Sequence, residues 1–157
     1  MTGLNRATLS DAFWAFAGIL PSLALVLWII DAEHGLALTS LGSTAILLFC
    51  FPAHEGSRPF AVVASHLLGA GIGVALLQLF GSNVWTMGAG VALIAVVMRL
   101  CNIMHPPAGA NPLIVLNLKS GWLFLAYPLA PALLILLAAV FLWSRLRPGP
   151  AWPARWL

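Results

Sequence analysis

Charged residues are scarce in this chain, and their scarcity excludes most kinds of soluble protein. The 157 residues include 7 Lys and Arg and 4 Asp and Glu, so charged side chains make up 7% of the sequence. Soluble domains carry about 25%. The low charge, together with long apolar stretches, excludes a disordered chain and a nucleic-acid binder. The formal net charge of +3 suits contact with anionic lipid headgroups instead.

Groups for covalent or redox chemistry are equally few. Cys50 and Cys101 are the only cysteines and form no Cys-x-x-Cys pair, so neither a disulfide scaffold nor a thiol redox site is expected. The carboxylates lie outside the long apolar runs, no nucleotide-binding motif occurs, and no group of side chains has metal-ligand spacing. We therefore expect no enzymatic activity, no metal and no cofactor.

Apolar residues dominate what remains, at 62% of the chain. They form runs of the length that an α-helix needs to cross a hydrocarbon core of about 30 Å. The pattern predicts an all-α, polytopic transmembrane helical bundle in one domain, with four long helices and two short or broken helical segments. The segments span about 13–30, 36–51, 60–80, 84–104, 105–118 and 122–143, and a basic interfacial tail follows at 144–157.

The few basic residues predict the orientation of the segments. If all six segments cross, Lys119 stands alone on one side, and the other side carries Arg6, Arg58, Arg99, Arg145, Arg147 and Arg155. Positively charged loops face the cytoplasm. This arrangement predicts a bacterial inner membrane protein with both termini cytoplasmic. If the two short segments instead dip in and return, the bias is weaker, because Arg58 and Arg99 join Lys119.

The two short segments are the first candidates for a site, because irregular backbone is tolerated at membrane depth only where protein or a watery cavity covers it. Each is expected to present free N–H groups at a helix N-terminus, which suits an anion or a polar solute. Simple kinks in packed helices remain the alternative. The candidate residues are Gly42, Ser43 and Thr44 in the first segment and His105, Pro106, Pro107, Gly109 and Asn111 in the second.

His66 and Arg99 are the ionisable candidates within the long segments. The short connection at 81–83 predicts an antiparallel hairpin, which places the two residues at one depth. Small residues recur every three or four positions beside both, so both side chains are expected on or near the packed interior. Ionisable groups inside a membrane cost about 2.5–3.5 kcal/mol and mark functional sites by default. Snorkelling of Arg99 to the headgroups and simple packing of His66 stay open.

A specific resemblance begins at Met104. The run from Met104 to Val115, Met-His-Pro-Pro-Ala-Gly-Ala-Asn-Pro-Leu-Ile-Val, closely resembles the signature of the HPP family of integral membrane proteins. The segment 41–49 is similar to the family's glycine-serine-alanine stretch, and Pro59 with the run 65–68, Ser-His-Leu-Leu, is similar to its proline and histidine-leucine helix. The similarity covers roughly 20–143.

Two further positions bear on this resemblance. Arg99, six residues before His105, falls where the family usually carries a basic residue. Phe60 departs from the pattern, because an arginine commonly follows the proline there, whereas here Arg58 precedes it.

The resemblance implies a small helical membrane protein with about four spanning helices and a poorly defined activity. Some plant plastid and cyanobacterial relatives are linked to nitrite transport. The order long, short, long occurs twice along the chain, with Gly42 and Gly109 in comparable places. If all six segments cross, this 3+3 repeat has halves of opposite orientation, as in transporters with inverted repeats.

These observations predict a membrane transporter or channel for a small polar solute, with an inorganic anion such as nitrite as the first candidate. The helix N-termini near Gly42 and Pro107 would bind the solute, Arg99 would attract charge, and His105 or His66 would carry protons. An accessory subunit that packs through its glycine faces, or a haem-binding electron carrier using His66 and His105, are the alternatives. The expected partners are the lipid bilayer, the solute and a second copy of the chain.

Overall fold

A computed structural model describes residues 6–30 and 38–157, which fold into helices and connecting turns without a strand in either range. Three helical stretches are long and apolar enough to cross a membrane, namely α1 (Arg6–Ile30), α3 (Pro59–Phe80) and the stretch Leu125–Leu146. The last consists of one wide turn, η4 (Leu125–Leu129), and α6 (Ala130–Leu146). The all-helical membrane architecture expected from the sequence is thus present.

The remaining elements are shorter. They are α2 (Thr39–Cys50), the single turn η2 (Glu55–Ser57), α4 (Val84–Leu100), the turn η3 (Pro106–Ala110) and α5 (Asn111–Leu118). At 1.5 Å per residue, α2 is about 18 Å long and α5 about 12 Å, so neither spans a hydrocarbon core of about 30 Å by itself. The first two residues of the expected segment 36–51 lie outside the described residues.

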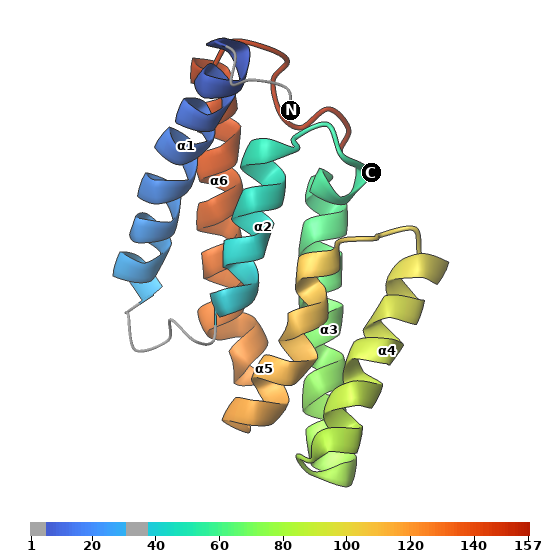
Figure 1. Cartoon of the computed structure of the whole chain (residues 1–157). Helices are drawn as coiled ribbons and strands as arrows, with labels where there is room; N and C mark the ends of the chain where they lie inside the picture. Colours follow the sequence, from blue (N-terminus) through green and yellow to red (C-terminus); the bar gives the residue numbers. More distant parts are fainter. Residues whose placement is uncertain (1–5, 31–37) are drawn as a thin grey trace.

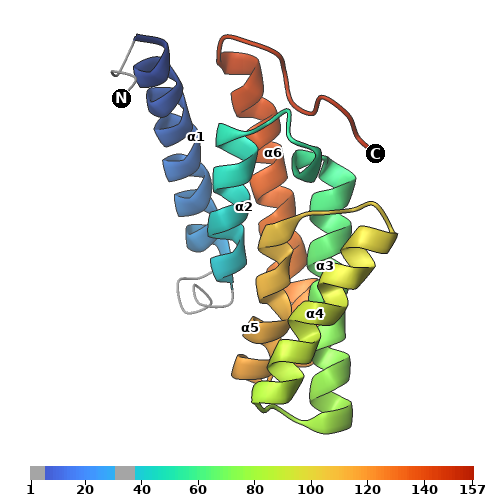
Figure 2. The same ribbon diagram turned by 45° about the vertical axis from the view of Figure 1, so that its right-hand side comes forward.

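Successive helices run in alternating directions, so α1, α3 and α5 descend and α2, α4 and α6 ascend in the view of Figure 1. Helix α1 packs against α2 and α6, and α3 packs against α4 and α5. The short elements α2 and η3 contact each other in the middle of the bundle (Figures 1 and 2). Within each short segment the chain therefore runs in one direction, opposite to that of the long helices before and after it.

The expectation of four long helices is not met, because α4 has 17 residues and ends at Leu100 instead of continuing to Met104. Asn102 takes a positive φ of 54°, and His105 precedes a proline, which disfavours helical backbone. The last long helix is also shifted, to Leu125–Leu146 from the expected 122–143, and Tyr127 interrupts it with extended φ and ψ just before Pro128.

The hairpin of α3 and α4 follows its local sequence as expected. Gly81 ends α3 with φ of 71°, a conformation that favours glycine. Asn83 then caps α4, because its side chain accepts hydrogen bonds from the N–H groups of Trp85 and Thr86, while the Thr86 hydroxyl accepts one from the Asn83 N–H.

Three glycines let η3 and α5 approach α3 and α4 closely. A Cβ at Gly69 would lie 2.9 Å from the carbonyl oxygen of Ala108, and a Cβ at Gly73 would lie 3.0 Å from the Cα of Pro112. A Cβ at Gly90 of α4 would lie 2.7 Å from the Cβ of Pro112. The small residues that the sequence shows on α3 therefore seat the broken segment in the bundle.

The C-terminal tail packs on the bundle. Trp152 is buried and its Nε1–H donates a hydrogen bond to the carbonyl oxygen of Ser57, at 2.8 Å. The Ser144 hydroxyl donates to the carbonyl oxygen of Trp152, and the Phe60 N–H donates to that of Trp156. The tail, expected to rest at the membrane interface, thus crosses the end of the bundle beside the loop that precedes α3 (Figure 1).

Candidate functional site

Four polar side chains come together inside the bundle, although they are far apart in the sequence. Thr44 comes from α2, His66 from α3, His105 from the residue before η3, and Asn111 from the start of α5. Each of the four is 0% exposed. We call this group the polar cluster. It lies where the two short segments meet each other and α3.

The Thr44 hydroxyl stands at the centre of the polar cluster. Its Oγ1 lies 2.9 Å from Nε2 of His66 and 3.0 Å from Nε2 of His105, and it also lies 3.0 Å from the carbonyl oxygen of Ser40, one turn earlier in α2. The two imidazole rings are tilted by 49° with their centroids 5.2 Å apart. One hydroxyl therefore bridges both histidines.

The outer nitrogens of the two imidazoles are also occupied. Nδ1 of His105 lies 2.6 Å from the carbonyl oxygen of Gly56, in the loop between α2 and α3. Nδ1 of His66 lies 2.9 Å from Nδ2 of Asn111, which also donates to the carbonyl oxygen of His66 at 2.9 Å. The cluster is thus a continuous chain of hydrogen bonds from Asn111 to Gly56.

Two further buried atoms near these residues have no hydrogen-bond partner, namely Oγ of Ser40 and Oδ1 of Asn111. A buried polar atom without a partner costs about 1–3 kcal/mol. Ser65 has a supporting position, since its hydroxyl donates to the carbonyl oxygen of Ile103 at 2.5 Å and so ties α3 to the chain before His105. The unpartnered atoms leave hydrogen-bonding capacity for a polar guest.

The structure brings together four of the ten residues expected at the site, Thr44, His66, His105 and Asn111. No hydrogen bond joins the other six to this group, and Arg99 is exposed on α4. Gly42 and Gly109 are half-buried, Ser43 and Pro106 are exposed, and Pro107 is half-buried. Because α2 begins at Thr39, the residues 42–44 lie past its first turn and their N–H groups are placed to bond within the helix. In α2 the candidate site therefore consists of the Thr44 side chain and not of free backbone N–H groups.

The second broken segment starts where its prolines predict. The turn η3 begins at Pro106 and leads directly into α5 at Asn111. The Ala108 N–H donates to the carbonyl oxygen of His105, and the Asn111 N–H donates to that of Ala108. This turn aims the side chains of His105 and Asn111 at α2 and α3.

The expectation that Arg99 lies in the packed interior is wrong, because its side chain is exposed. The inward face of α4 carries Gly90, Ile94 and Met98, which are buried. The small residues one and two turns before Arg99 on its own face, Ala95 and Ala92, are exposed as well. In a chain this apolar, small residues on a helix mark close packing only when a partner helix is present, and the outward face of α4 has none among the described residues.

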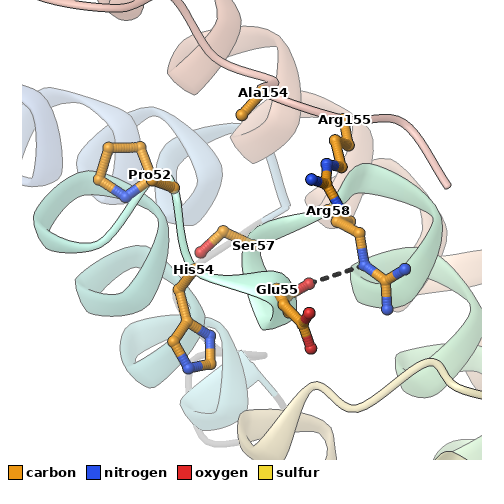
Figure 3. A pocket seen from close by; sticks show the side chains of 8 residues that line it. Pro52, His54, Glu55, Ser57, Arg58, Ala154 and Arg155 are labelled. Atoms are coloured by element: carbon orange, nitrogen blue, oxygen red, sulfur yellow. Dashed lines mark hydrogen bonds between the residues drawn. The ribbon is translucent and has the colours of Figure 1, made fainter.

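A polar pocket of about 340 Å³ opens at the end of the bundle, between the loop that precedes α3 and the C-terminal tail (Figure 3). Arg58 is held there by hydrogen bonds from its Nε to the carbonyl oxygen of Glu55 and from its Nη2 to that of Asn102, at 2.9 and 2.6 Å. The pocket is lined by Pro52, Ala53, His54, Glu55, Ser57, Arg58, Ala154 and Arg155. We call it the basic pocket.

The basic pocket and the polar cluster adjoin through Gly56. Its N–H donates to Nδ1 of His54, which lines the pocket, at 3.0 Å, and its carbonyl oxygen contacts Nδ1 of His105. Gly56 is tightly enclosed, since a Cβ there would lie 3.0 Å from the carbonyl oxygen of Met104. One buried residue therefore separates a basic surface pocket from the cluster.

Sequence reasoning missed Ser40, Gly56 and Trp152. Ser40 lies one helical turn before Thr44, on the same face, so the spacing of the two hydroxyl residues was the available signal. Gly56 contributes through its backbone N–H and carbonyl groups, and the residue type does not predict such a role. Trp152 lies in a stretch rich in proline and arginine, and nothing in that stretch predicts a buried side chain.

The two clustered histidines do not fit the alternative of axial haem ligands. Both Nε2 atoms point to one hydroxyl group, and the ring centroids are 5.2 Å apart. The macrocycle of a haem has no room between rings placed in this way. Among residues 6–30 and 38–157, no three His, Cys, Asp or Glu side chains gather as a metal-ligand set.

The sequence matches a known protein family. The family model described as HPP, transmembrane region, matches residues 4–153. Two curated proteins of Dictyostelium discoideum, both described as transmembrane proteins, are 27% identical to the chain, over 90% and 96% of its length. The chain spans about half the length of these relatives, 53% of each. No solved structure matches the chain. The family match and the apolar helices identify an integral membrane protein in contact with a lipid bilayer.

Proposed function

The chain belongs to the HPP transmembrane family, and from this premise we propose that it is a transporter or channel for a small polar solute. The observation that carries the proposal is the polar cluster, four fully buried polar side chains where two short segments meet inside an apolar bundle. Polar and ionisable groups in a membrane are costly and are retained for function by default. Broken helices at membrane depth are the common framework of such solute sites.

An inorganic anion such as nitrite is the proposed solute. The basic pocket adjoins the cluster and carries Arg58 and Arg155, against the single carboxylate of Glu55. A surface recess with excess positive charge raises the local concentration of small anions. The resemblance of the His-Pro-Pro run to a family with members linked to nitrite transport makes nitrite the first anion to test.

The arrangement of the helices favours a mechanism in which two halves move against each other. One half consists of α1, α2 and α3, and the other of α4, α5 and α6, so that α1 corresponds to α4, α2 to α5 and α3 to α6. The contacts of the first half then have counterparts in the second. The contact of α1 with α6 corresponds to that of α4 with α3, the contact of α1 with α2 to that of α4 with α5, and the contact of α2 with α6 to that of α5 with α3, and all of them occur. Because successive helices alternate in direction, the halves run in opposite directions, as in inverted-repeat transporters.

The polar cluster lies between these halves. Thr44 and His66 belong to the first half, and His105 and Asn111 belong to the second. Rocking of one half against the other would separate Thr44 from His105 and His66 from Asn111, and would open the cluster to water and to the solute.

The proposed orientation places both termini in the cytoplasm of a bacterial cell, with the chain in the inner membrane. The start of α1, the loop of Arg58 and the end of α6 lie at one end of the bundle, and Lys119 follows α5 at the other (Figure 1). Basic residues gather on the cytoplasmic side of membrane proteins. The basic pocket would then open to the cytoplasm.

Flux into liposomes that contain this chain alone tests the proposal. Nitrite, nitrate, formate and chloride are offered one at a time, and uptake is compared with empty liposomes. We expect uptake of nitrite by the wild type, loss of uptake in Asn111→Leu and retention in Asn117→Leu, which alters an exposed residue of the same helix. Gel filtration in detergent verifies that each variant is folded.

Two outcomes would overturn the proposal. The first is wild-type protein that is folded but carries none of the four anions above the empty-liposome rate, which leaves an accessory role in a larger assembly. The second is equal uptake by a folded Asn111→Leu and by the wild type, which removes the polar cluster from the path.

A further inference from the structure

We propose that the polar cluster is a binding site for one proton, carried by His105, and that the Thr44 hydroxyl changes partner to accommodate it. The proposal deepens the proposed function by naming the coupling ion and its site, and it rests on that function only for the use of the proton in transport. The argument comes from the donors and acceptors that surround the two imidazoles.

Both ends of the hydrogen-bond chain have fixed directions. A carbonyl oxygen only accepts, so the contact of 2.6 Å with the Gly56 oxygen requires a proton on Nδ1 of His105. At the other end, Asn111 faces the carbonyl oxygen of His66, which fixes its amide with the NH₂ group toward His66. That NH₂ group also meets Nδ1 of His66, which must therefore accept, so the proton of a neutral His66 is on Nε2.

The neutral cluster then has one consistent pattern. Nε2–H of His66 donates to the Thr44 oxygen, and the Thr44 hydroxyl donates to Nε2 of His105, which carries no proton. The two histidines hold opposite tautomers, and every ring nitrogen has a partner. Thr44 is suited to the centre because a hydroxyl is at once a donor and a double acceptor.

The same geometry accepts one more proton without loss of a hydrogen bond to either imidazole. When a proton adds to the free electron pair of Nε2 of His105, the new N–H donates to the Thr44 oxygen. The Thr44 hydroxyl proton turns to the carbonyl oxygen of Ser40, already 3.0 Å away. The Thr44 oxygen then accepts from both histidines through its two lone pairs, and Nδ1–H of His105 still donates to Gly56.

His66 cannot take the proton in the same way. Protonation of its Nδ1 would place an N–H against the NH₂ group of Asn111, two donors facing each other. Rotation of the amide would relieve that contact but would turn Oδ1 of Asn111 toward the carbonyl oxygen of His66. His105 is therefore the residue that carries the proton, and Asn111 holds His66 in its tautomer.

The groups around His105 do not neutralise the added charge in advance. On α3 it faces His66, and beyond Gly56 the pocket side holds His54, Glu55 and Arg58. α2 offers the uncharged Thr44 and Ser40. The added positive charge thus creates a site for a negative solute beside the cluster, which is the behaviour that proton and anion cotransport needs.

Nitrogen-15 NMR of histidine-labelled protein in nanodiscs, without any solute, tests the proton site separately from transport. Signals of His34 and His54 are identified by substitution of each with Gln. At high pH we expect the remaining two signals to show one Nε2–H and one Nδ1–H tautomer. On acidification, the histidine with the Nδ1–H tautomer, which the proposal identifies as His105, should gain a second N–H. The other histidine should keep its Nε2–H tautomer.

Variants at Thr44 assign the switch. Thr44→Ser keeps the hydroxyl and should gain the second N–H at the pH of the wild type. Thr44→Val removes the oxygen that accepts this N–H and should gain it only at a more acidic pH, while Gly56 and Asn111 still fix the two tautomers. Two matching tautomers in the wild type, or first protonation of the histidine with the Nε2–H tautomer, would overturn the proposal. Fixed opposite tautomers in a protein that carries no anion would support the proton site and refute only the transport function.

Discussion

Substitution of Gly69 by alanine tests how tightly the broken segment must sit on α3 to form the polar cluster. The added Cβ would lie 2.9 Å from the carbonyl oxygen of Ala108, and ordinary contact begins at 3.4 Å, so the backbone of η3 must move. A shift of that size would lengthen the two bonds from Asn111 to His66, now 2.9 Å each, to about the limit of a hydrogen bond. Overpacking of this kind costs about 1–3 kcal/mol.

The matched control is Gly71→Ala in the same helix. A Cβ there would lie 3.7 Å from the Trp122 ring, an ordinary contact, and alanine stabilises a helix by up to about 1 kcal/mol relative to glycine. We expect Gly69→Ala to melt lower than Gly71→Ala in detergent by roughly 2–4 °C for each kcal/mol, and to lose nitrite uptake. Equal melting temperatures with wild-type uptake in both variants would refute the close packing described above.

Three further predictions concern the parts that hold the bundle together. Trp152→Phe loses the hydrogen bond to Ser57 and should lower the free energy of unfolding by about 1 kcal/mol in a denaturant titration, whereas the exposed Trp156 should tolerate the same change. Asn83→Ala removes the cap of α4 and should cost about 0.5–2 kcal/mol, with Asn83→Ser near the wild type; an equal loss in both would contradict the capping role. Gly81→Ala should destabilise the hairpin because φ is 71°, and a thermal shift of zero would refute that strain.

The sequence predicted the elements of the fold better than their lateral contacts. Apolar runs and chain breakers placed most segments, and the Gly81–Asn83 turn and the prolines at 106 and 107 set a hairpin and a helix start. The end of α4 was missed because the run 101–104 stays largely apolar after the helix stops. Hydrophobicity indicates only that a side chain avoids water. In a membrane, contact with lipid removes a side chain from water just as contact with another helix does, so hydrophobicity does not distinguish the two.

The same ambiguity explains the mixed result at the site. His66 was expected in the interior with its glycine face, and Gly69 and Gly73 do contact η3 and α5. Arg99 was placed inside by the same kind of pattern and is exposed, because the buried face of α4 carries Gly90, Ile94 and Met98. The bridge from Thr44 to both histidines joins residues 22 and 61 positions apart, and no local pattern in one sequence encodes such a contact.

The central claim is that the polar cluster lies on a path that water and small ions enter, and thiol accessibility at Ser40 tests it most directly. The variant Ser40→Cys, with Cys50 and Cys101 replaced by Ser, puts a thiol where a buried hydroxyl has no partner. We predict that a small, charged, membrane-impermeant thiol reagent modifies it, that nitrite slows the reaction, and that Ala45→Cys, equally buried in the core of α2, stays unreactive. Equal inertness of both thiols in folded, membrane-embedded protein would contradict the account.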